Sequence, residues 1–120
     1  MDKADQSFFR GLLFNRLKDL NLKAEEASVS LIDTDNNFPD PTDRATAETE
    51  RDFMLRIRER ERKLIIKIQE ALQRIDEGDF GECEECGDDI GTERLKARPE
   101  ATLCIGCKRK QESAERVRGL

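Results

Sequence analysis

Two prolines that separate long stretches of helical periodicity constrain the fold of this chain more than any other feature. Pro39 and Pro41 lie in the short segment 37–43. Proline lacks a backbone N–H donor and clashes with the preceding helical turn, so a helix cannot run through both positions. Because the helical pattern stops and restarts so sharply, the sequence predicts a helical hairpin with this segment at its end.

The restart of the helix after the prolines is well specified. Asp40 suits the N-cap position, Pro41 the first helical position, and Asp43 the third, as in a capping box. The hairpin tip, residues 33–44, therefore carries two carboxylates. Two interpretations of these aspartates remain open: they only cap the helix, or they also act on a partner.

The composition favours a thin structure. The chain has 120 residues, of which 41% are charged and 36% hydrophobic, with six Phe and no Trp or Tyr. A two-helix hairpin buries only a seam, so it needs little apolar material. The net charge of −5 argues against a general nucleic-acid binder, because such proteins neutralise phosphates with basic side chains.

The chain is expected to be cytoplasmic. No apolar run approaches the roughly 20 residues of a membrane span, and the N-terminus lacks a signal-peptide core. In that reducing compartment, four cysteines are better explained as metal ligands than as disulfides.

Apolar residues spaced alternately by three and four positions predict two helices that pack along a heptad seam. The first helix is expected over residues 1–33, with Phe8, Phe9, Leu12 and Phe14 enlarging its apolar surface near the start. The second is expected over 41–77, ended by Gly78. At about 1.5 Å per residue it is roughly 54 Å long, a length that suits a partner with a deep groove or channel. The seam positions are Leu13, Leu17, Leu20, Ala24, Ala27 and Leu31 in the first helix, and Met54, Ile57, Glu61, Leu64, Ile68, Ala71 and Ile75 in the second.

A dense run of charge occupies residues 56–63 of the second helix. One interpretation is a solvated face with Glu–Arg pairs at helical spacing, each worth about 0.2–0.5 kcal/mol. The other is a docking face for an acidic or mixed protein surface.

The cysteine pattern is the most specific chemical signal. Cys83-x2-Cys86 and Cys104-x2-Cys107 supply four thiolates, enough to close a tetrahedral zinc site and leave no position for a catalytic water. One structural Zn²⁺ is therefore predicted, holding together a module too small for a core of its own. Two disulfides, or an iron or iron–sulfur site, are the alternatives.

The local sequence around the cysteines indicates how this module folds. Gly87 suits a tight knuckle after Cys86, and residues 88–91 read as a turn. Residues 92–96 are interpreted as a short strand, and residues 107–117 as a short helix. The sequence thus predicts a mostly α protein: a long antiparallel two-helix coiled-coil hairpin over 1–78, then a small four-cysteine zinc finger with a short C-terminal helix over 79–120.

Three segments together resemble the DksA/TraR zinc-finger family of RNA polymerase-binding transcription factors, across nearly the whole chain. Members carry an extra N-terminal segment, whereas this chain begins almost at the hairpin, so its globular end is expected to be smaller. The segments are Asp40-Pro41-Thr42-Asp43-Arg44-Ala45, then Arg60-Glu61-Arg62-Lys63-Leu64-Ile65, and the finger with Cys83-x2-Cys86-Gly87, Ala97-Arg98-Pro99 and Leu103-Cys104-Ile105-x-Cys107-Lys108.

The resemblance implies a regulator without enzymatic turnover. Family members bind RNA polymerase, insert the hairpin into its secondary channel, and destabilise open promoter complexes together with the stringent-response nucleotide ppGpp. DNA is not their principal ligand and no sequence-specific DNA binding is implied, in agreement with the acidic net charge.

The resemblance also implies roles for individual residues. Asp40, Asp43 and Ala45 correspond to the tip residues that act on the polymerase, and Arg60 to a docking residue. Four further residues correspond to a ppGpp site shared with the polymerase: Leu64, Lys67, Arg98 and Lys108. The assignment of Lys108 has a separate physical reason. This residue is expected to open the final helix, and a helix N-terminus favours anions.

Two other functions remain possible at this point. Transcript-cleavage factors of the Gre type also present a helical hairpin with an acidic tip, which helps to place a catalytic Mg²⁺. A zinc-bearing coiled-coil adaptor would dock on some other protein. A cleavage assay on backtracked complexes would distinguish a transcript-cleavage factor from the regulator that the resemblance implies. A pull-down that identifies the partner would distinguish an adaptor from it.

Overall fold

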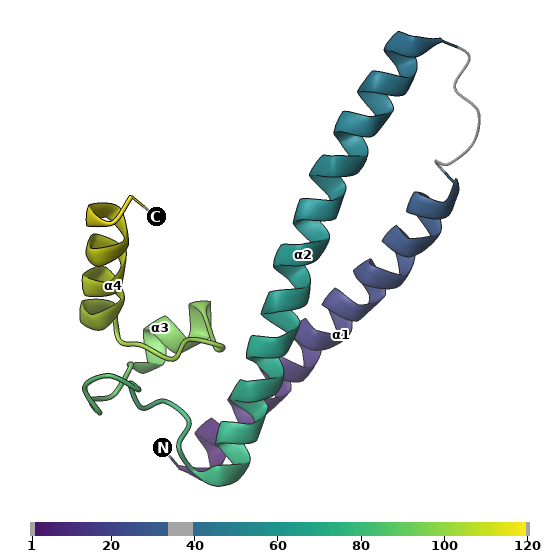
Figure 1. Cartoon of the computed structure of the whole chain (residues 1–120). Helices are drawn as coiled ribbons and strands as arrows, with labels where there is room; N and C mark the ends of the chain where they lie inside the picture. Colours follow the sequence, from purple (N-terminus) through teal and green to yellow (C-terminus); the bar gives the residue numbers. More distant parts are fainter. Residues whose placement is uncertain (1, 34–39, 120) are drawn as a thin grey trace. The chain divides into compact units, whose positions relative to one another are not determined.

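The computed structural model describes residues 2–33 and 40–119, with side chains over 2–26 and 40–119. Four helices occupy these residues: α1 (Lys3–Asp33), α2 (Pro41–Glu77), α3 (Thr92–Ala97) and α4 (Ile105–Val117) (Figure 1). The turn predicted at 37–43 is described only from Asp40 onward; residues 34–39 of the predicted tip, which include Pro39, lie outside the described residues, as do the side chains of Ala27 and Leu31. In the part of the chain that is described, no helix is long and apolar enough to cross a membrane.

The lower end of α2 closes as the sequence predicts. Gly78 has a φ of 87°, a left-handed conformation that glycine adopts without steric cost. Its N–H donates to the carbonyl of Ile75 at 3.3 Å, and the N–H of Asp79 donates to that of Arg74 at 3.0 Å. These two bonds form a Schellman motif, which satisfies carbonyls that the helix itself leaves without donors.

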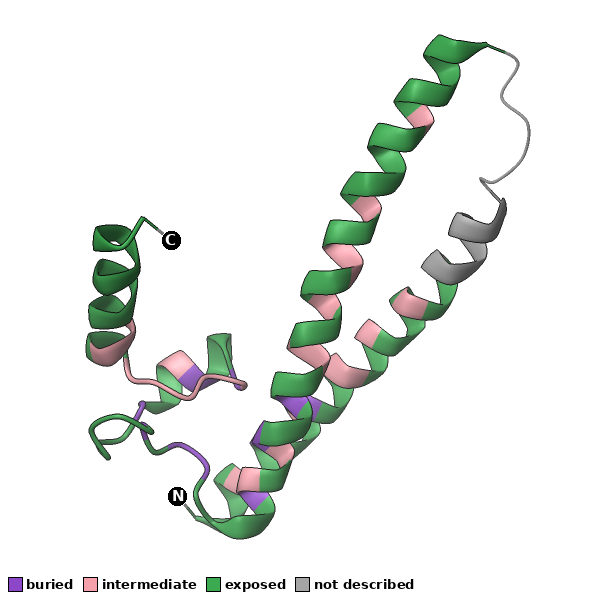
Figure 2. Ribbon diagram, in the orientation of Figure 1, coloured by how far each residue is buried: buried purple, intermediate pink, exposed green. Residues whose placement is uncertain are grey.

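The chain divides into two compact units: Met1–Phe14 with Lys67–Leu120, and Asn15–Ile66. The first unit holds the core, and Figure 2 shows its buried residues where the start of α1 meets the end of α2. The ring centroids of Phe9 and Phe80 lie 5.4 Å apart, joining the helices to the finger. The core consists of Phe9, Leu13, Ile68, Ala71, Ile75, Phe80, Cys83, Ile90 and Leu95.

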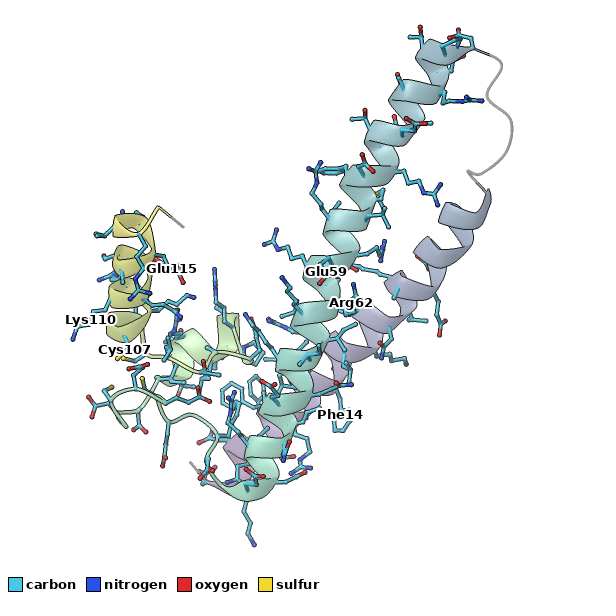
Figure 3. All side chains as sticks on the ribbon, in the orientation of Figure 1. Phe14, Glu59, Arg62, Cys107, Lys110 and Glu115 are labelled. Atoms are coloured by element: carbon cyan, nitrogen blue, oxygen red, sulfur yellow. The ribbon has the colours of Figure 1, made fainter. Side chains whose placement is uncertain are left out.

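Only one of the phenylalanines near the start of α1 becomes a core residue. Phe9 and Leu13 are one turn apart and both are buried, whereas Phe8 and Phe14 are each 53% exposed. Residues four apart lie on one helix face, so the face that meets α2 takes Phe9 and leaves its neighbours on the flanks. Phe14 projects away from the ribbon of α1 in Figure 3.

The second unit is an antiparallel pair formed by the rest of α1 and α2. Its described seam residues are only half-buried, among them Leu17, Leu20, Ile57 and Leu64. Two packed helices cover the residues between them from two sides only, so these side chains remain partly exposed to solvent. The thin core that the composition predicts is found in this unit.

The prediction of a strand over residues 92–96 is wrong: Thr92–Ala97 forms α3. The one bridge between extended residues in the described chain joins Glu82 and Asp89. A further strand would have no partner for its backbone groups, whereas one helical turn pairs them locally and still buries Leu95.

Candidate functional site

The four cysteines converge on one point of the finger. Their sulfur atoms all lie within 4.8 Å of one another, and those of Cys86 and Cys104 are 3.8 Å apart. Tetrahedral zinc with Zn–S bonds of about 2.3 Å requires S···S distances of about 3.8 Å. The arrangement therefore fits a closed tetrahedral site.

Two backbone turns build this cluster. In the first knuckle, the N–H of Gly87 donates to the carbonyl of Cys83 at 3.0 Å, and Gly87 has a φ of 77°. In the second, Cys104 is the N-cap of α4, and its sulfur accepts the N–H of Cys107 at 3.5 Å. Cys107 thus sits in the first turn of α4 (Figure 3).

Further hydrogen bonds hold the two knuckles together. Cys83 N–H donates to the carbonyl of Asp88 at 2.8 Å, and Glu84 N–H donates to that of Thr102 at 2.9 Å. The Arg94 Nε donates to the carbonyl of Leu103 at 3.1 Å, which ties α3 to the second knuckle. Sequence reasoning missed this last contact, since nothing in the sequence places residue 94 beside residue 103.

The close packing of the four cysteines and their backbone hydrogen bonds move the pKa values of the thiols in opposite directions. Backbone hydrogen bonds, first at Cys104 and then at Cys86, lower the pKa of Cys83 to about 6. The Cys104 and Cys83 thiols raise the pKa of Cys107 to about 12. A backbone hydrogen bond at Asp88 lowers the pKa of Cys86, but the Cys83 thiol, burial and the Cys104 thiol together raise it above its ordinary value. Four thiolates cannot coexist here without a compensating cation, and a divalent metal supplies that charge.

At the upper end of the hairpin, Asp40 is confirmed as the N-cap of α2. Its Oδ1 accepts the N–H groups of Thr42 at 2.6 Å and Asp43 at 3.2 Å, and its carbonyl accepts that of Arg44 at 3.1 Å. Among the described residues, no group binds the carboxylate of Asp43, which is exposed. Ala45 is also exposed, one turn into the helix.

Arg60 lies on an exposed basic face of α2. Arg56, Arg60 and Lys63 follow one another at spacings of four and three, so they share one side of the helix, and all three are exposed. None of the three has a partner in the described structure. By contrast, Arg58 pairs with Glu61, and Arg62 with Glu59.

The residues expected to bind ppGpp come from α2, from the end of α3 and from α4. Lys67 is exposed on α2, and Arg98 is exposed at the C-terminal end of α3, while Leu64 belongs to the seam. Arg98 is extended (φ −136°, ψ 79°), as its position before Pro99 requires.

The expectation that Lys108 opens the final helix is wrong. Helix α4 begins at Ile105, and the N–H of Lys108 already donates to the carbonyl of Cys104 at 2.9 Å. Its ammonium donates to Gln111 Oε1 at 3.1 Å. Lys108 can therefore offer an anion its side chain, but not a free backbone N–H.

Both parts of the chain match models of known families. Residues 5–75 match the N-terminal domain of the DnaK suppressor protein DksA, and residues 78–113 match the prokaryotic DksA/TraR C4-type zinc finger. The chain belongs to the DksA/TraR family. The cysteine cluster is accordingly the zinc finger of this family, which holds one structural zinc ion.

Several characterised proteins of the family are similar along most of the chain. The RNA polymerase-binding transcription factor DksA of Escherichia coli (strain K12) is 44% identical over 116 residues, 97% of this chain and 77% of that protein. Its Haemophilus influenzae counterpart is 52% identical over 95 residues, 77% of this chain and 66% of that protein. These relatives are named as transcription factors, not as enzymes.

A solved structure shows that the fold is shared as well. Transcription factor DksA2 from Pseudomonas aeruginosa superposes with a TM-score of 0.86 at 45% identity, over 97% of this chain and 89% of that one. The fold of a long helical hairpin with a small zinc finger, predicted from the sequence, is thereby confirmed.

Proposed function

We propose that this protein is a transcription regulator that binds RNA polymerase and inserts its hairpin tip into the secondary channel of the enzyme. There, together with ppGpp, it shortens the lifetime of open promoter complexes. Membership of the DksA/TraR family carries the proposal, because relatives 44% and 52% identical are RNA polymerase-binding transcription factors. A polymerase partner also implies a cytoplasmic location and no need for direct DNA recognition.

The geometry of the tip supports a division of labour between its two aspartates. The carboxylate of Asp40 is occupied by capping hydrogen bonds to Thr42 and Asp43. The carboxylate of Asp43 is exposed, and it has no partner among the described residues. Asp43 is therefore the residue that presents negative charge to the polymerase. Asp40 caps the start of α2 and so holds the backbone from which the Asp43 side chain extends. Ala45 contributes a small exposed side chain that permits close approach.

The unpaired basic face of α2 supports docking through Arg60. An arginine or lysine in water gains little from a solvent-exposed ion pair, but a complementary acidic surface can engage three aligned cations at once and steer association. Arg60 follows Asp40 by 20 residues of continuous helix, on the order of 30 Å. Docking on this face and action at the tip are thus separate along one helix.

The shared ppGpp site is supported by the incomplete set of cations on this chain. Lys67, Arg98 and Lys108 supply only three positive charges, on a protein with a net charge of −5. Polyphosphate binding then requires further groups from the polymerase. Leu64 would contribute its apolar surface beside Lys67, which lies one turn further along α2.

The proposal is tested with purified RNA polymerase. Competition binding measures the affinity with and without ppGpp, and filter binding or fluorescence measures the lifetime of an open complex at a ribosomal RNA promoter. We expect binding, a shorter lifetime, and a larger effect with ppGpp. Absence of polymerase binding overturns the proposal. Cleavage of backtracked transcripts without any effect on open complexes would replace it with a transcript-cleavage function.

A further inference from the structure

Arg58 joins the two helices of the hairpin through the backbone. Its Nη1 donates to the carbonyl oxygen of Lys23 in α1 at 2.9 Å and to Glu61 Oε2 in α2 at 2.9 Å. The Arg58 and Glu61 side chains are only 22% and 20% exposed. Glu61 is the one polar residue of the α2 seam, and this bond explains how its charge is tolerated there.

The seam position next to Lys23 carries a small side chain. Ala24 follows Lys23 directly, and it is half-buried. A guanidinium can reach a helix carbonyl only where the neighbouring seam side chains leave room. One heptad earlier, Leu17 occupies the corresponding position and would fill that space.

The apolar seam alone does not specify this alignment. Aliphatic contacts are non-directional, and a heptad pattern can be satisfied after a slip of seven residues, about 10 Å along the helix. A single polar residue in a coiled-coil seam is a known means of excluding wrong registers. From the bond to Lys23 and the small Ala24 beside it, we propose that Arg58, oriented by Glu61, sets the register of α1 against α2 in the second unit. This inference does not depend on the proposed function.

The register is measured as a distance between two spin labels in the full-length zinc-loaded protein. Exposed positions Asp19 on α1 and Glu48 on α2 are suitable because they lie at different levels of the hairpin. The four cysteines bind the metal, so the labels are attached through introduced non-natural amino acids. The wild-type protein should give one narrow distance distribution.

The decisive variant is the double substitution Arg58→Met and Glu61→Leu. Arg58 and Glu61 are partly buried, and replacing an ion pair withdrawn from water by apolar residues of similar size is often neutral or stabilising, so this variant should remain folded. We expect a broadened distribution, or a second distance displaced by up to about 10 Å for a full-heptad slip. A single distance as narrow as that of the wild type overturns the proposal.

A matched pair on the same helix provides the control. Arg62 and Glu59, both labelled in Figure 3, form an ion pair at the same spacing, but their side chains are 71% and 49% exposed. The double substitution Arg62→Met and Glu59→Leu should leave the distance distribution unchanged. Equal broadening in this control would show that the effect is not specific to the bond between Arg58 and Lys23, and would also overturn the proposal.

Discussion

The N–H of Asp43 donates to Oδ1 of Asp40 over 3.2 Å, so one tip aspartate is held by the backbone of the other. The capping carboxylate accepts two hydrogen bonds, while the carboxylate of Asp43 stays exposed. This asymmetry supports the proposed roles of the two aspartates, which can be tested by substitutions that remove charge without removing the cap.

Asp43→Asn should abolish most of the effect on open-complex lifetime while the affinity for RNA polymerase stays close to that of the wild type. The substitution removes the unpaired negative charge but leaves the docking face of α2 intact. Asp40→Asn should do less harm, because Asn caps a helix about as well as Asp. Promoter-complex lifetime and competition binding are measured on the same preparations. Full promoter activity in Asp43→Asn would leave both aspartates with only a capping role.

Substituting Lys67, Arg98 and Lys108 singly by Ala should remove the ppGpp-dependent part of regulation and spare basal binding to polymerase. Each change deletes one cation from the proposed phosphate site, which further groups of the polymerase would complete. Titration of ppGpp against the complex measures the loss. Lys110→Ala is the control, since Lys110 is an exposed cation on the same helix as Lys108 (Figure 3). Tight ppGpp binding by the isolated protein would contradict a shared site.

Protein purified without added metal should contain about one zinc per chain, and Cys104→Ser should lose it. Removing this ligand opens the metal site, whereas the serine hydroxyl can still cap α4 in place of the sulfur. Most of the helical circular dichroism should persist, because α1 and α2 contain 31 and 37 residues whereas α3 and α4 contain 6 and 13. Elemental analysis that finds iron, or thiol titration that finds four oxidised cysteines, would reject the zinc assignment.

Zinc should be released as the pH falls, and not as it rises moderately above neutral. The metal requires thiolates, and protons compete for the same sulfur atoms. Neighbouring thiols raise the pKa values of Cys86 and Cys107, so these sulfurs regain protons readily once the metal leaves. A chromogenic chelator added over a pH series measures the release. Loss that is independent of pH would indicate that protonation of the cysteines does not control the site.

Phe9→Ala should destabilise the first unit by about 3–5 kcal/mol, the usual cost of removing a buried aromatic side chain. Phe9 is 1% exposed and contacts Phe80 in the finger. Phe14→Ala is the matched control in the same helix; with a half-exposed side chain it should cost under about 1 kcal/mol. Denaturant unfolding followed by circular dichroism compares the two. Similar costs would show that the burial of Phe9 is not what joins the helices to the finger.

The helix ends and the metal ligands could be predicted from the sequence because their signals are local. Asp40 and Pro41 start α2 and Gly78 ends it through bonds to residues within a few positions. The paired spacing of the cysteines likewise specifies a tetrahedral site whatever the surrounding fold. Heptad spacing located both seams, because the period of the helix sets which residues share a face.

Features that depend on residues distant in the chain were decided only by the tertiary structure. Residues 92–97 are helical, and no strand among the described residues could pair with them. Phe9 rather than Phe8 entered the core because of the direction from which α2 and Phe80 approach. The bond from Arg58 to the carbonyl of Lys23 joins residues 35 positions apart. Such contacts depend on how two helices align in space, and a pattern read along a single helix carries no information about that alignment.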